Sequence, residues 1–235
     1  ERGIIVCGAG GGLPNHTAEL TWGLIFSVLR HIPEEVQRLK AGRWQTTVGT
    51  TVVGKTLGVY AYGRIGSIVA RVGRAFDMKV ICWGREGSTA KARADGFEVA
   101  ASREAFFEAS DIVSLHIPLN KETRAIVKYT DLARMRPTAL IVNTSRGPII
   151  EEGALVRALK EGHPGFGAVD VYDEEPVLNG NHPLLKMENA VCTPHLGYVD
   201  RDTYEKYYGV AVDNILAYAE GKPINVLNPE ALNKK

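Results

Sequence analysis

LGVYAYGRIG, residues 57–66, is the stretch that decides the fold. A run of apolar and β-branched residues leads into a turn with Gly63 and Gly66, and a helix-like segment continues to residue 76. A parallel βαβ unit places a dinucleotide pyrophosphate at such a strand–turn–helix junction, because the helix N-terminus attracts negative charge. Residues 57–66 therefore predict the first strand and phosphate loop of a dinucleotide-binding domain.

The loop departs from the G-x-G-x-x-G pattern, because Ala61 occupies the first glycine position. Alanine is acceptable there if its φ angle is negative, whereas Gly63 lets the backbone approach the pyrophosphate closely. The pattern A-x-G-x-x-G alone also fits an ordinary tight turn between a strand and a helix. Its position after the first strand of an alternating pattern favours the dinucleotide interpretation.

Five further apolar runs follow along the chain, separated by helix-like segments. The runs lie at 79–83, 111–115, 138–143, 166–171 and 190–193, and the helices at 64–76, 88–94, 103–109, 130–135 and 151–161. These runs are continuously apolar, which is typical of strands covered on both faces. The pattern predicts an α/β fold with a doubly wound parallel sheet, the Rossmann arrangement.

Composition narrows the class of protein. The 235 residues are 45% hydrophobic and carry a formal net charge of +1, which is typical of a soluble globular protein and gives no reason to expect a nucleic-acid or membrane partner. The longest apolar stretch, residues 20–29, is too short to span a bilayer. Three widely spaced cysteines predict reduced thiols and a cytoplasmic location, and no metal site is predicted.

The end of the second strand bears on the choice between NAD and NADP. The ribose 2′-hydroxyl of NAD is usually bound by an acidic residue there, but Gly84 and Arg85 occupy this place. Without a carboxylate, a 2′-phosphate meets no repulsion, and Arg85 offers it a bidentate contact. Alternatively, Arg85 is a solvated loop residue and Glu86 contacts the ribose. The residues favour NADP modestly, and both cofactors stay open.

Three polar segments follow predicted strands and carry the candidate chemistry: N-T-S-R-G at 143–147, D-V-Y-D-E-E-P at 170–176 and T-P-H-L-G at 193–197. Ligands of an open α/β sheet lie beyond the carboxyl ends of its strands, so Arg146, Glu175 and His195 are expected to meet in one crevice. Taken singly, each has an ordinary alternative: a surface ion-pair arginine, a solvent-facing glutamate and a loop histidine. Their occurrence together, each after a strand, favours a catalytic set.

Reduction of a 2-oxoacid explains these residue types. Arg146 offers a planar, permanently charged fork for the substrate carboxylate and polarises the carbonyl. Hydride from a nicotinamide leaves an alkoxide that needs a proton, which His195 can supply near neutral pH. Glu175 is assigned the role of stabilising the imidazolium.

The three motifs in this order resemble the D-isomer-specific 2-hydroxyacid dehydrogenase family, which includes glycerate, phosphoglycerate, glyoxylate and formate dehydrogenases. The resemblance runs from residues 17–19 to the C-terminal tail and implies an oxidoreductase that transfers a hydride between NAD or NADP and a 2-oxoacid or D-2-hydroxyacid. It implies cofactor contacts from Gly63, Arg64, Ile65, Gly66, Arg85, His116, Pro118, Thr144, Asp170 and Gly197. His116 is interpreted as a wall of the cofactor pocket and not as a second catalytic histidine. Tyr198 stands where the family usually has a small residue, so the identity of the 2-oxoacid stays open.

The resemblance also implies a domain organisation. Residues 17–200 are expected to form the Rossmann domain. Residues 1–16, including a strand at 3–7, are expected to be a remnant of a flavodoxin-like substrate domain, and residues 201–235 a crossover helix and a C-terminal tail that returns to that domain. Most of the N-terminal substrate domain is expected to be missing, and restoring it is expected to raise turnover. An excursion around 32–50 with Trp44 matches an arm that wraps a partner subunit in relatives, which predicts a homodimer.

Two other functions compete with this interpretation. Transcriptional corepressors resemble the family and keep a similar Arg, Glu and His set, so a non-enzymatic dinucleotide-binding module is the alternative from another class. Within enzymes, a Rossmann oxidoreductase acting on amino acids or thioethers would not need the acid of D-x-x-x-x-E-P beside the histidine. Assays with several 2-oxoacids would distinguish these functions.

Overall fold

The computed structural model describes residues 3–10 and 12–233. The chain forms two compact units: Pro14–Gly197 is the larger, and Glu1–Leu13 combines with Tyr198–Lys235 in the smaller. The predicted substrate-domain segments extend to residues 1–2, 11 and 234–235, which lie outside the described residues. None of the helices in the described ranges is long and apolar enough to cross a membrane.

The larger unit is built on a seven-stranded parallel sheet in the order β3-β2-β1-β4-β5-β6-β7. Its strands are β1 Thr56–Tyr60, β2 Lys79–Trp83, β3 Glu98–Val99, β4 Ile112–Leu115, β5 Leu140–Asn143, β6 Phe166–Val169 and β7 Ala190–Cys192. The chain moves outward from β1 to β3 and then returns to pair β4 with the other edge of β1. The predicted doubly wound α/β sheet is confirmed, and its switch point lies between β1 and β4.

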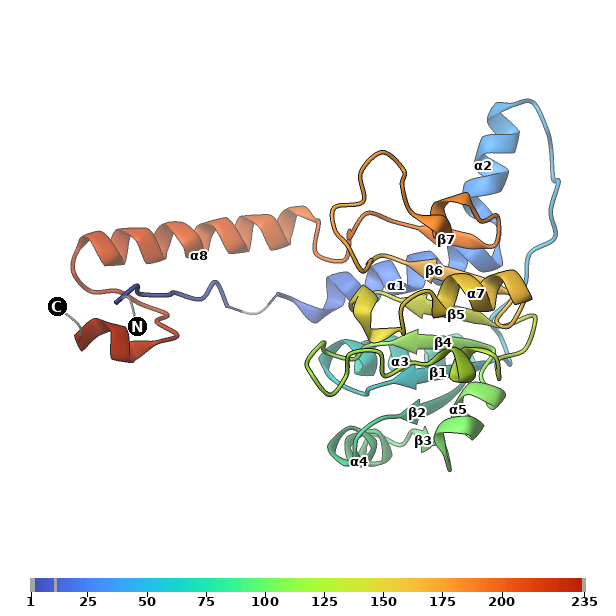
Figure 1. Ribbon diagram of the computed structural model, residues 1–235, viewed down its shortest axis with the longest axis horizontal. Helices are drawn as coiled ribbons and strands as arrows, with labels where there is room; N and C mark the ends of the chain where they lie inside the picture. The colour runs from blue at the N-terminus through green and yellow to red at the C-terminus, as the bar shows by residue number, and fades with distance from the viewer. Residues whose placement is uncertain (1–2, 11, 234–235) are drawn as a thin grey trace. The chain divides into compact units, whose positions relative to one another are not determined.

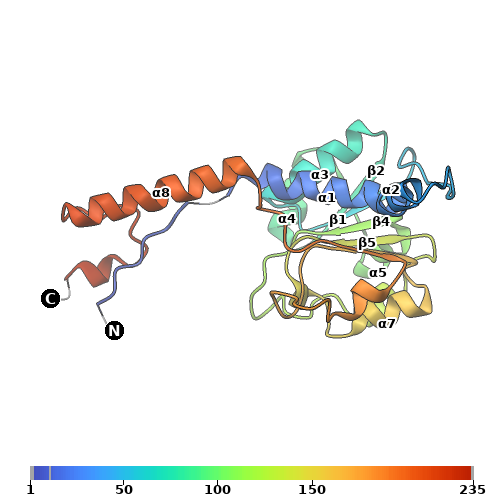
Figure 2. The same ribbon diagram turned by 90° about the horizontal axis from the view of Figure 1, so that it is seen from above.

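Helices cover both faces of this sheet (Figure 2). On one face lie α1 Pro14–Leu29 and α3 Arg64–Ala75. On the other face lie α5 Arg103–Ala109, α6 Tyr129–Leu132 and α7 Ala154–Glu161. The unit also contains α4 Glu86–Ala94 and the 3-10 turns η1 Gly147–Ile149 and η2 Pro183–Lys186. Two apolar clusters, one on each face, enclose the strands. The continuous burial of β4 and β5 follows from this double cover, and it explains why the sequence shows no alternation in these strands.

An arm follows α1. Residues 32–50, predicted to be an excursion, begin with α2 Ile32–Lys40, and α2 with the loop after it projects from the rest of the unit (Figure 1). The loop is closed onto α2 by Glu35, whose carboxylate accepts hydrogen bonds from the Thr46 and Thr47 hydroxyls at 2.5 and 2.8 Å. Apolar residues are nonetheless exposed here, including Leu39 at 55% and Trp44 at 75%.

The smaller unit contains α8 Arg201–Ala219 and the 3-10 turn η3 Pro229–Asn233. The strand predicted at residues 3–7 is wrong: only Cys7 is paired, in an isolated antiparallel bridge to Val226. Two backbone hydrogen bonds flank that bridge, from Gly8 N–H and to the Val6 carbonyl. A strand needs a neighbour along its whole length, and the segment around 225–227 offers one for only about three residues.

Candidate active site

The phosphate loop joins β1 to α3 as the sequence predicts. Gly63 is the residue before α3, and no side chain caps the helix there. Ala61, however, has φ of 73°, in the left-handed region, so the condition of a negative φ that would make alanine acceptable at this position is not met. The turn imposes this conformation, because Ala61 N–H donates to the Trp83 carbonyl at 2.7 Å while its own carbonyl accepts from Gly63 N–H at 2.9 Å.

The loop fits a dinucleotide pyrophosphate. A Cβ placed on Gly63 would meet no atom within 4 Å, so the space beside this backbone is open, whereas a Cβ on Gly66 would lie 2.4 Å from the Ala61 carbonyl oxygen. Gly63 thus allows close approach of a ligand, and Gly66 allows close packing of helix and loop. Arg64 and Ile65 form the first turn of α3 between them, with Ile65 packed against the core. An uncapped helix N-terminus beside open backbone is suited to a phosphate group.

The loop after β2 is attached to the phosphate loop. Ser88 Oγ accepts a hydrogen bond from Tyr62 N–H at 2.6 Å, and a Cβ on Gly84 would lie 3.4 Å from Ala61 Cα. Arg85, between them, precedes the first residue of α4 and is exposed. Its guanidinium forms no ion pair with any described residue. A positive side chain is therefore free to meet a ligand beside the phosphate loop.

Arg146 lies in a loop held by its neighbours after β5. The Asn143 side chain donates to the Arg146 carbonyl at 2.9 Å and accepts from Ser145 N–H at 3.0 Å, while Ser145 Oγ donates to the Leu115 carbonyl at the end of β4. The guanidinium is exposed and bonded to the Ser145 carbonyl, and it forms no ion pair among the described residues. This leaves its charge available for a carboxylate.

Glu175 and His195 form a hydrogen-bonded pair. Glu175 Oε2 lies 2.6 Å from His195 Nδ1, and the two side chains are 32% and 27% exposed. The other carboxylate oxygen of Glu175 accepts from Tyr172 N–H at 2.8 Å. A carboxylate on Nδ1 orients the ring and directs the Nε2 edge away from itself, which is the arrangement of a histidine used for proton transfer.

Asp170 organises the loop that carries His195. Its buried carboxylate accepts hydrogen bonds from the Thr193 hydroxyl at 2.6 Å, from Leu196 N–H at 2.7 Å and from Gly197 N–H at 2.9 Å. These bonds bracket His195, whose φ of 54° is in the left-handed region that a side chain rarely adopts. Backbone strain of this kind persists only where surrounding contacts fix it.

The remaining predicted cofactor residues lie in different surroundings. Pro118 is exposed, after β4, whereas Thr144 is buried and its hydroxyl is hydrogen-bonded to that of Thr21 in α1 at 2.9 Å. His116 bonds through Nε2 to Ser114 Oγ at 2.9 Å, and its Nδ1 is buried without a partner among the described residues. Burial lowers the pKa of His116 to about 4, so the ring is neutral at physiological pH and offers no positive charge.

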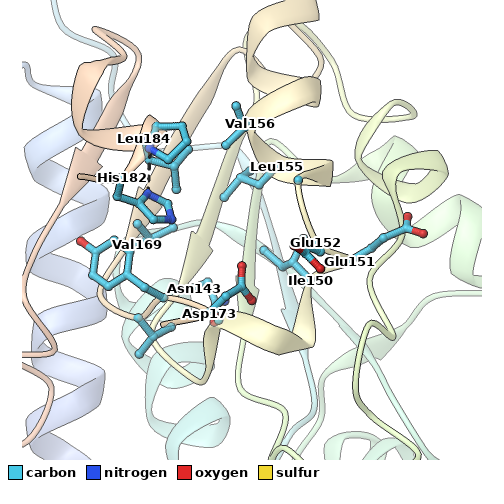
Figure 3. Close-up of a pocket in the computed structure, with 15 residues that line it drawn as sticks. Asn143, Ile150, Glu151, Glu152, Leu155, Val156, Val169, Asp173, His182 and Leu184 are labelled. Atoms are coloured by element: carbon cyan, nitrogen blue, oxygen red, sulfur yellow. Dashed lines mark hydrogen bonds between the residues drawn. The ribbon is translucent and has the colours of Figure 1, made fainter. Parts of the chain in front are cut away.

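A cavity of about 260 Å³ lies behind two of these loops (Figure 3). His182 and Leu184 lie on one side of it, Leu155 and Val156 of α7 lie on the other, and Asp173 is at its edge. The cavity is also lined by Gly147 and Tyr172, residues of the arginine and glutamate loops. Neither His195 nor Glu175 lines this cavity, so the cavity is separate from the candidate catalytic pair.

Tyr172 links the three predicted segments, and the sequence interpretation did not single it out. A Cβ on Gly147 would lie only 2.2 Å from the Tyr172 carbonyl carbon, so the arginine loop and the glutamate loop touch. Tyr172 also bonds to Glu175, which bonds to His195. The tyrosine was visible within D-V-Y-D-E-E-P, but its contacts depend on folding and leave no separate signal in the sequence.

Comparisons with known proteins show the family of this chain. Residues 22–197 match the family described as D-isomer specific 2-hydroxyacid dehydrogenase, NAD binding domain. A glyoxylate reductase from Aeropyrum pernix is 40% identical over 98% of this chain and 71% of its own length. A D-3-phosphoglycerate dehydrogenase from Bacillus subtilis is 34% identical over 100% of this chain and 45% of its own length.

A solved structure of a phosphoglycerate oxidoreductase from Vibrio cholerae is 42% identical, with a TM-score of 0.87, over 90% of this chain and 69% of that one. All three relatives carry the names of enzymes, which gives no support to a corepressor. A nicotinamide dinucleotide is the cofactor that the matched domain binds. The phosphate loop, the parallel sheet and the match over residues 22–197 together establish that this chain belongs to the D-isomer specific 2-hydroxyacid dehydrogenase family of nicotinamide-dependent oxidoreductases.

Proposed function

We propose that the protein reduces a short 2-oxoacid to its D-2-hydroxyacid, with Arg146, Glu175 and His195 as its catalytic residues. The observation that carries these roles is the 2.6 Å contact between Glu175 Oε2 and His195 Nδ1 at the carboxyl ends of the strands. Glyoxylate is the first substrate to test, because a relative 40% identical to this chain is named a glyoxylate reductase.

Each residue has a distinct task in this reaction. The guanidinium of Arg146 binds the substrate carboxylate through two parallel hydrogen bonds and polarises the neighbouring carbonyl. A nicotinamide dinucleotide held at the phosphate loop by Gly63 and the N-terminus of α3 would supply the hydride for this reduction. His195 gives its Nε2 proton to the carbonyl oxygen, and Glu175 stabilises the imidazolium before that transfer. In the oxidative direction the neutral histidine accepts the proton from the hydroxyacid.

Substitutions separate these tasks. Arg146→Lys keeps the charge but loses the planar fork, so KM for the 2-oxoacid should rise and kcat should fall. His195→Asn should lower kcat by about 100-fold or more while the dissociation constant for the dinucleotide changes less than about twofold. His163→Gln is the matched control, because its Nδ1 bonds to the Met135 carbonyl away from the catalytic loops. Near-normal turnover in either catalytic variant would contradict the role assigned to that residue.

We further propose that NADPH is used at least as well as NADH. The support is the unpaired Arg85 guanidinium beside Gly84, in a loop hydrogen-bonded to the phosphate loop through Ser88. A charge-assisted contact to a 2′-phosphate is worth about 1–3 kcal/mol, so Arg85→Ala should weaken NADPH binding by about 5-fold to 150-fold and leave NADH binding nearly unchanged. Arg93→Ala, at the other end of α4, is the control for loss of charge. Equal losses for both dinucleotides would contradict this role.

The arm supports a second proposal, that two copies of the chain form a two-fold dimer. The exposed apolar residues of α2 and the following loop, with Leu39 and Trp44 among them, line a hollow of about 640 Å³ that nothing else in the larger unit fills. A self-complementary contact of this surface is the usual symmetric solution. Leu39→Glu should convert a dimeric mass to a monomeric one in analytical ultracentrifugation, whereas Leu185→Glu, also an exposed leucine, should not. A monomeric parent protein at micromolar concentration would contradict the proposal.

We place the protein in the cytoplasm. Cys7, Cys82 and Cys192 are all free thiols in the structure, which is typical of a reducing compartment. Cell fractionation with an antibody to the protein tests this location, and recovery in an oxidising compartment would contradict it.

A further inference from the structure

His195 depends on a turn that its own backbone does not favour. Its φ of 54° is left-handed, and its N–H donates to the Thr193 carbonyl at 3.1 Å, which closes a three-residue turn centred on Pro194 that leads into His195. This conformation is unfavourable for a residue with a side chain by roughly 1–2 kcal/mol. The imidazole stays beside Glu175 only while the turn keeps this shape, because a change to negative φ would reorient the ring.

A second donor reaches the same carbonyl. The Tyr172 hydroxyl donates to the Thr193 carbonyl at 2.9 Å, from a side chain that is only 8% exposed. The Tyr172 ring packs edge-on against His182 with 5.0 Å between the centroids, so the hydroxyl is held in a fixed direction. Burial raises the pKa of Tyr172 above its usual range, and the hydroxyl therefore stays protonated as a donor at every physiological pH.

The same tyrosine also holds the carboxylate. Its backbone N–H donates to Glu175 Oε1 at 2.8 Å, while Glu175 Oε2 contacts His195 Nδ1 at 2.6 Å. One residue thus fixes the carboxylate through its backbone and the histidine turn through its side chain. Asp170 supports the residues on either side of His195, but the carbonyl that closes the turn is bonded by Tyr172 and not by Asp170.

We propose that Tyr172 is a positioning residue for proton transfer, which acts through its hydroxyl by holding the Thr193 carbonyl of the turn that leads into His195, and through its backbone by holding the carboxylate of Glu175. The inference rests on the proposed roles of His195 and Glu175. Tyr172 itself touches no reacting atom, so its removal acts on kcat through the direction of the imidazole. A displacement of about 1 Å at a catalytic group can lower a rate by up to about 100-fold.

Tyr172→Phe isolates the hydroxyl, because it keeps the ring, its packing on His182 and the backbone bond to Glu175. We expect kcat to fall by about 3-fold to 10-fold, the equivalent of one neutral hydrogen bond, with KM for the 2-oxoacid and the dissociation constant for NADH or NADPH within about twofold of the parent. Tyr129→Phe is the control, since its hydroxyl donates to Glu161 between α6 and α7. It should change none of these constants.

Two further measurements make the inference falsifiable. Hydrogen exchange of the His195 amide, which reports the turn without any turnover, should accelerate about tenfold in Tyr172→Phe. In a His195→Asn background, Tyr172→Phe should lower the residual rate by less than about twofold, because the residue through which it acts is gone. An unchanged kcat, an unchanged exchange rate, or an equal loss of kcat in both backgrounds would overturn the proposal.

The outcome of His195→Asn distinguishes failure of the positioning role of Tyr172 from failure of the proposed function. If that variant is nearly inactive and Tyr172→Phe behaves like the parent, the positioning role is wrong while the proposed function stands. If His195→Asn turns over normally, the proposed function is wrong, and a positioning role for Tyr172 in proton transfer falls with it.

Discussion

Replacing Ala61 with glycine should stabilise the protein, although alanine-to-glycine substitutions usually do the opposite. Ala61 has φ of 73°, and the left-handed region is unfavourable for alanine by roughly 1–2 kcal/mol. Glycine removes that strain, but it adds backbone entropy to the unfolded chain, which offsets about 0.4–1 kcal/mol. Loss of a half-buried methyl group removes about 0.4 kcal/mol more, as half of one buried carbon. The expected net gain is therefore about 0.5 kcal/mol.

Ala90→Gly is the control for this prediction. Ala90 is exposed within α4, where glycine has no strain to relieve and costs about 1 kcal/mol relative to alanine. Urea unfolding of the two variants should therefore give free energies that differ by about 1.5 kcal/mol, with Ala61→Gly above the parent and Ala90→Gly below it. If both substitutions destabilise the protein equally, the phosphate loop holds no left-handed strain at Ala61 and the reasoning fails.

Three further predictions concern pH and packing. Burial lowers the pKa of His116 from 6.5 to about 4, so its neutral form stabilises the fold above pH 6.5 and this contribution is lost as pH falls through 4. His116→Gln should therefore make the urea midpoint of unfolding fall less steeply between pH 6.5 and pH 4. Hydrogen bonds from the Thr46 and Thr47 hydroxyls are the main cause that lowers the pKa of Glu35 from 4.5 to about 2. The ionised carboxylate therefore stabilises the folded arm above pH 4.5, and this stabilisation is lost as the pH falls toward 2. Amide exchange in the arm should accelerate over that range and be fast already at pH 6 in Glu35→Gln. Gly147→Ala would place a Cβ 2.2 Å from the Tyr172 carbonyl carbon and should lower kcat/KM at least about tenfold, whereas Gly23→Ala, with open space around it, should be neutral.

The sequence alone predicted six of the seven strands that the structure describes in the sheet. Strands buried on both faces leave continuous apolar runs, so β1, β2 and β4 to β7 were recognised to within two residues of their ends. β3 was missed because Glu98–Val99 is too short, and too polar at its first residue, to leave such a run. The strand predicted at residues 3–7 failed for the opposite reason, since an apolar run without a partner along its length does not form a strand.

The sequence indicated at which strand ends the candidate residues lie, but not their backbone conformations. The motifs around Arg146, Glu175 and His195 each follow a strand, so their common edge could be derived from topology. The φ angle of Ala61 could not, because it is set by the Trp83 carbonyl across the sheet and not by its neighbours in sequence. The contacts of Tyr172 were hidden in the same way, since its partner Thr193 lies 21 residues away.

The strand order also separates the proposed cofactor-preference residue, Arg85, from the proposed proton-transfer residue, His195. Arg85 follows β2, whereas His195 follows β7, and five strand intervals of about 4.8 Å place these strand ends about 24 Å apart. Substitutions that far apart act additively unless they share a partner. Preference for one dinucleotide over the other can therefore drift, or be redesigned, on one half of the sheet while the proton-transfer residues on the other half remain untouched. A library randomised at residues 84–88 should yield altered cofactor preference with little epistasis toward variants at the histidine loop.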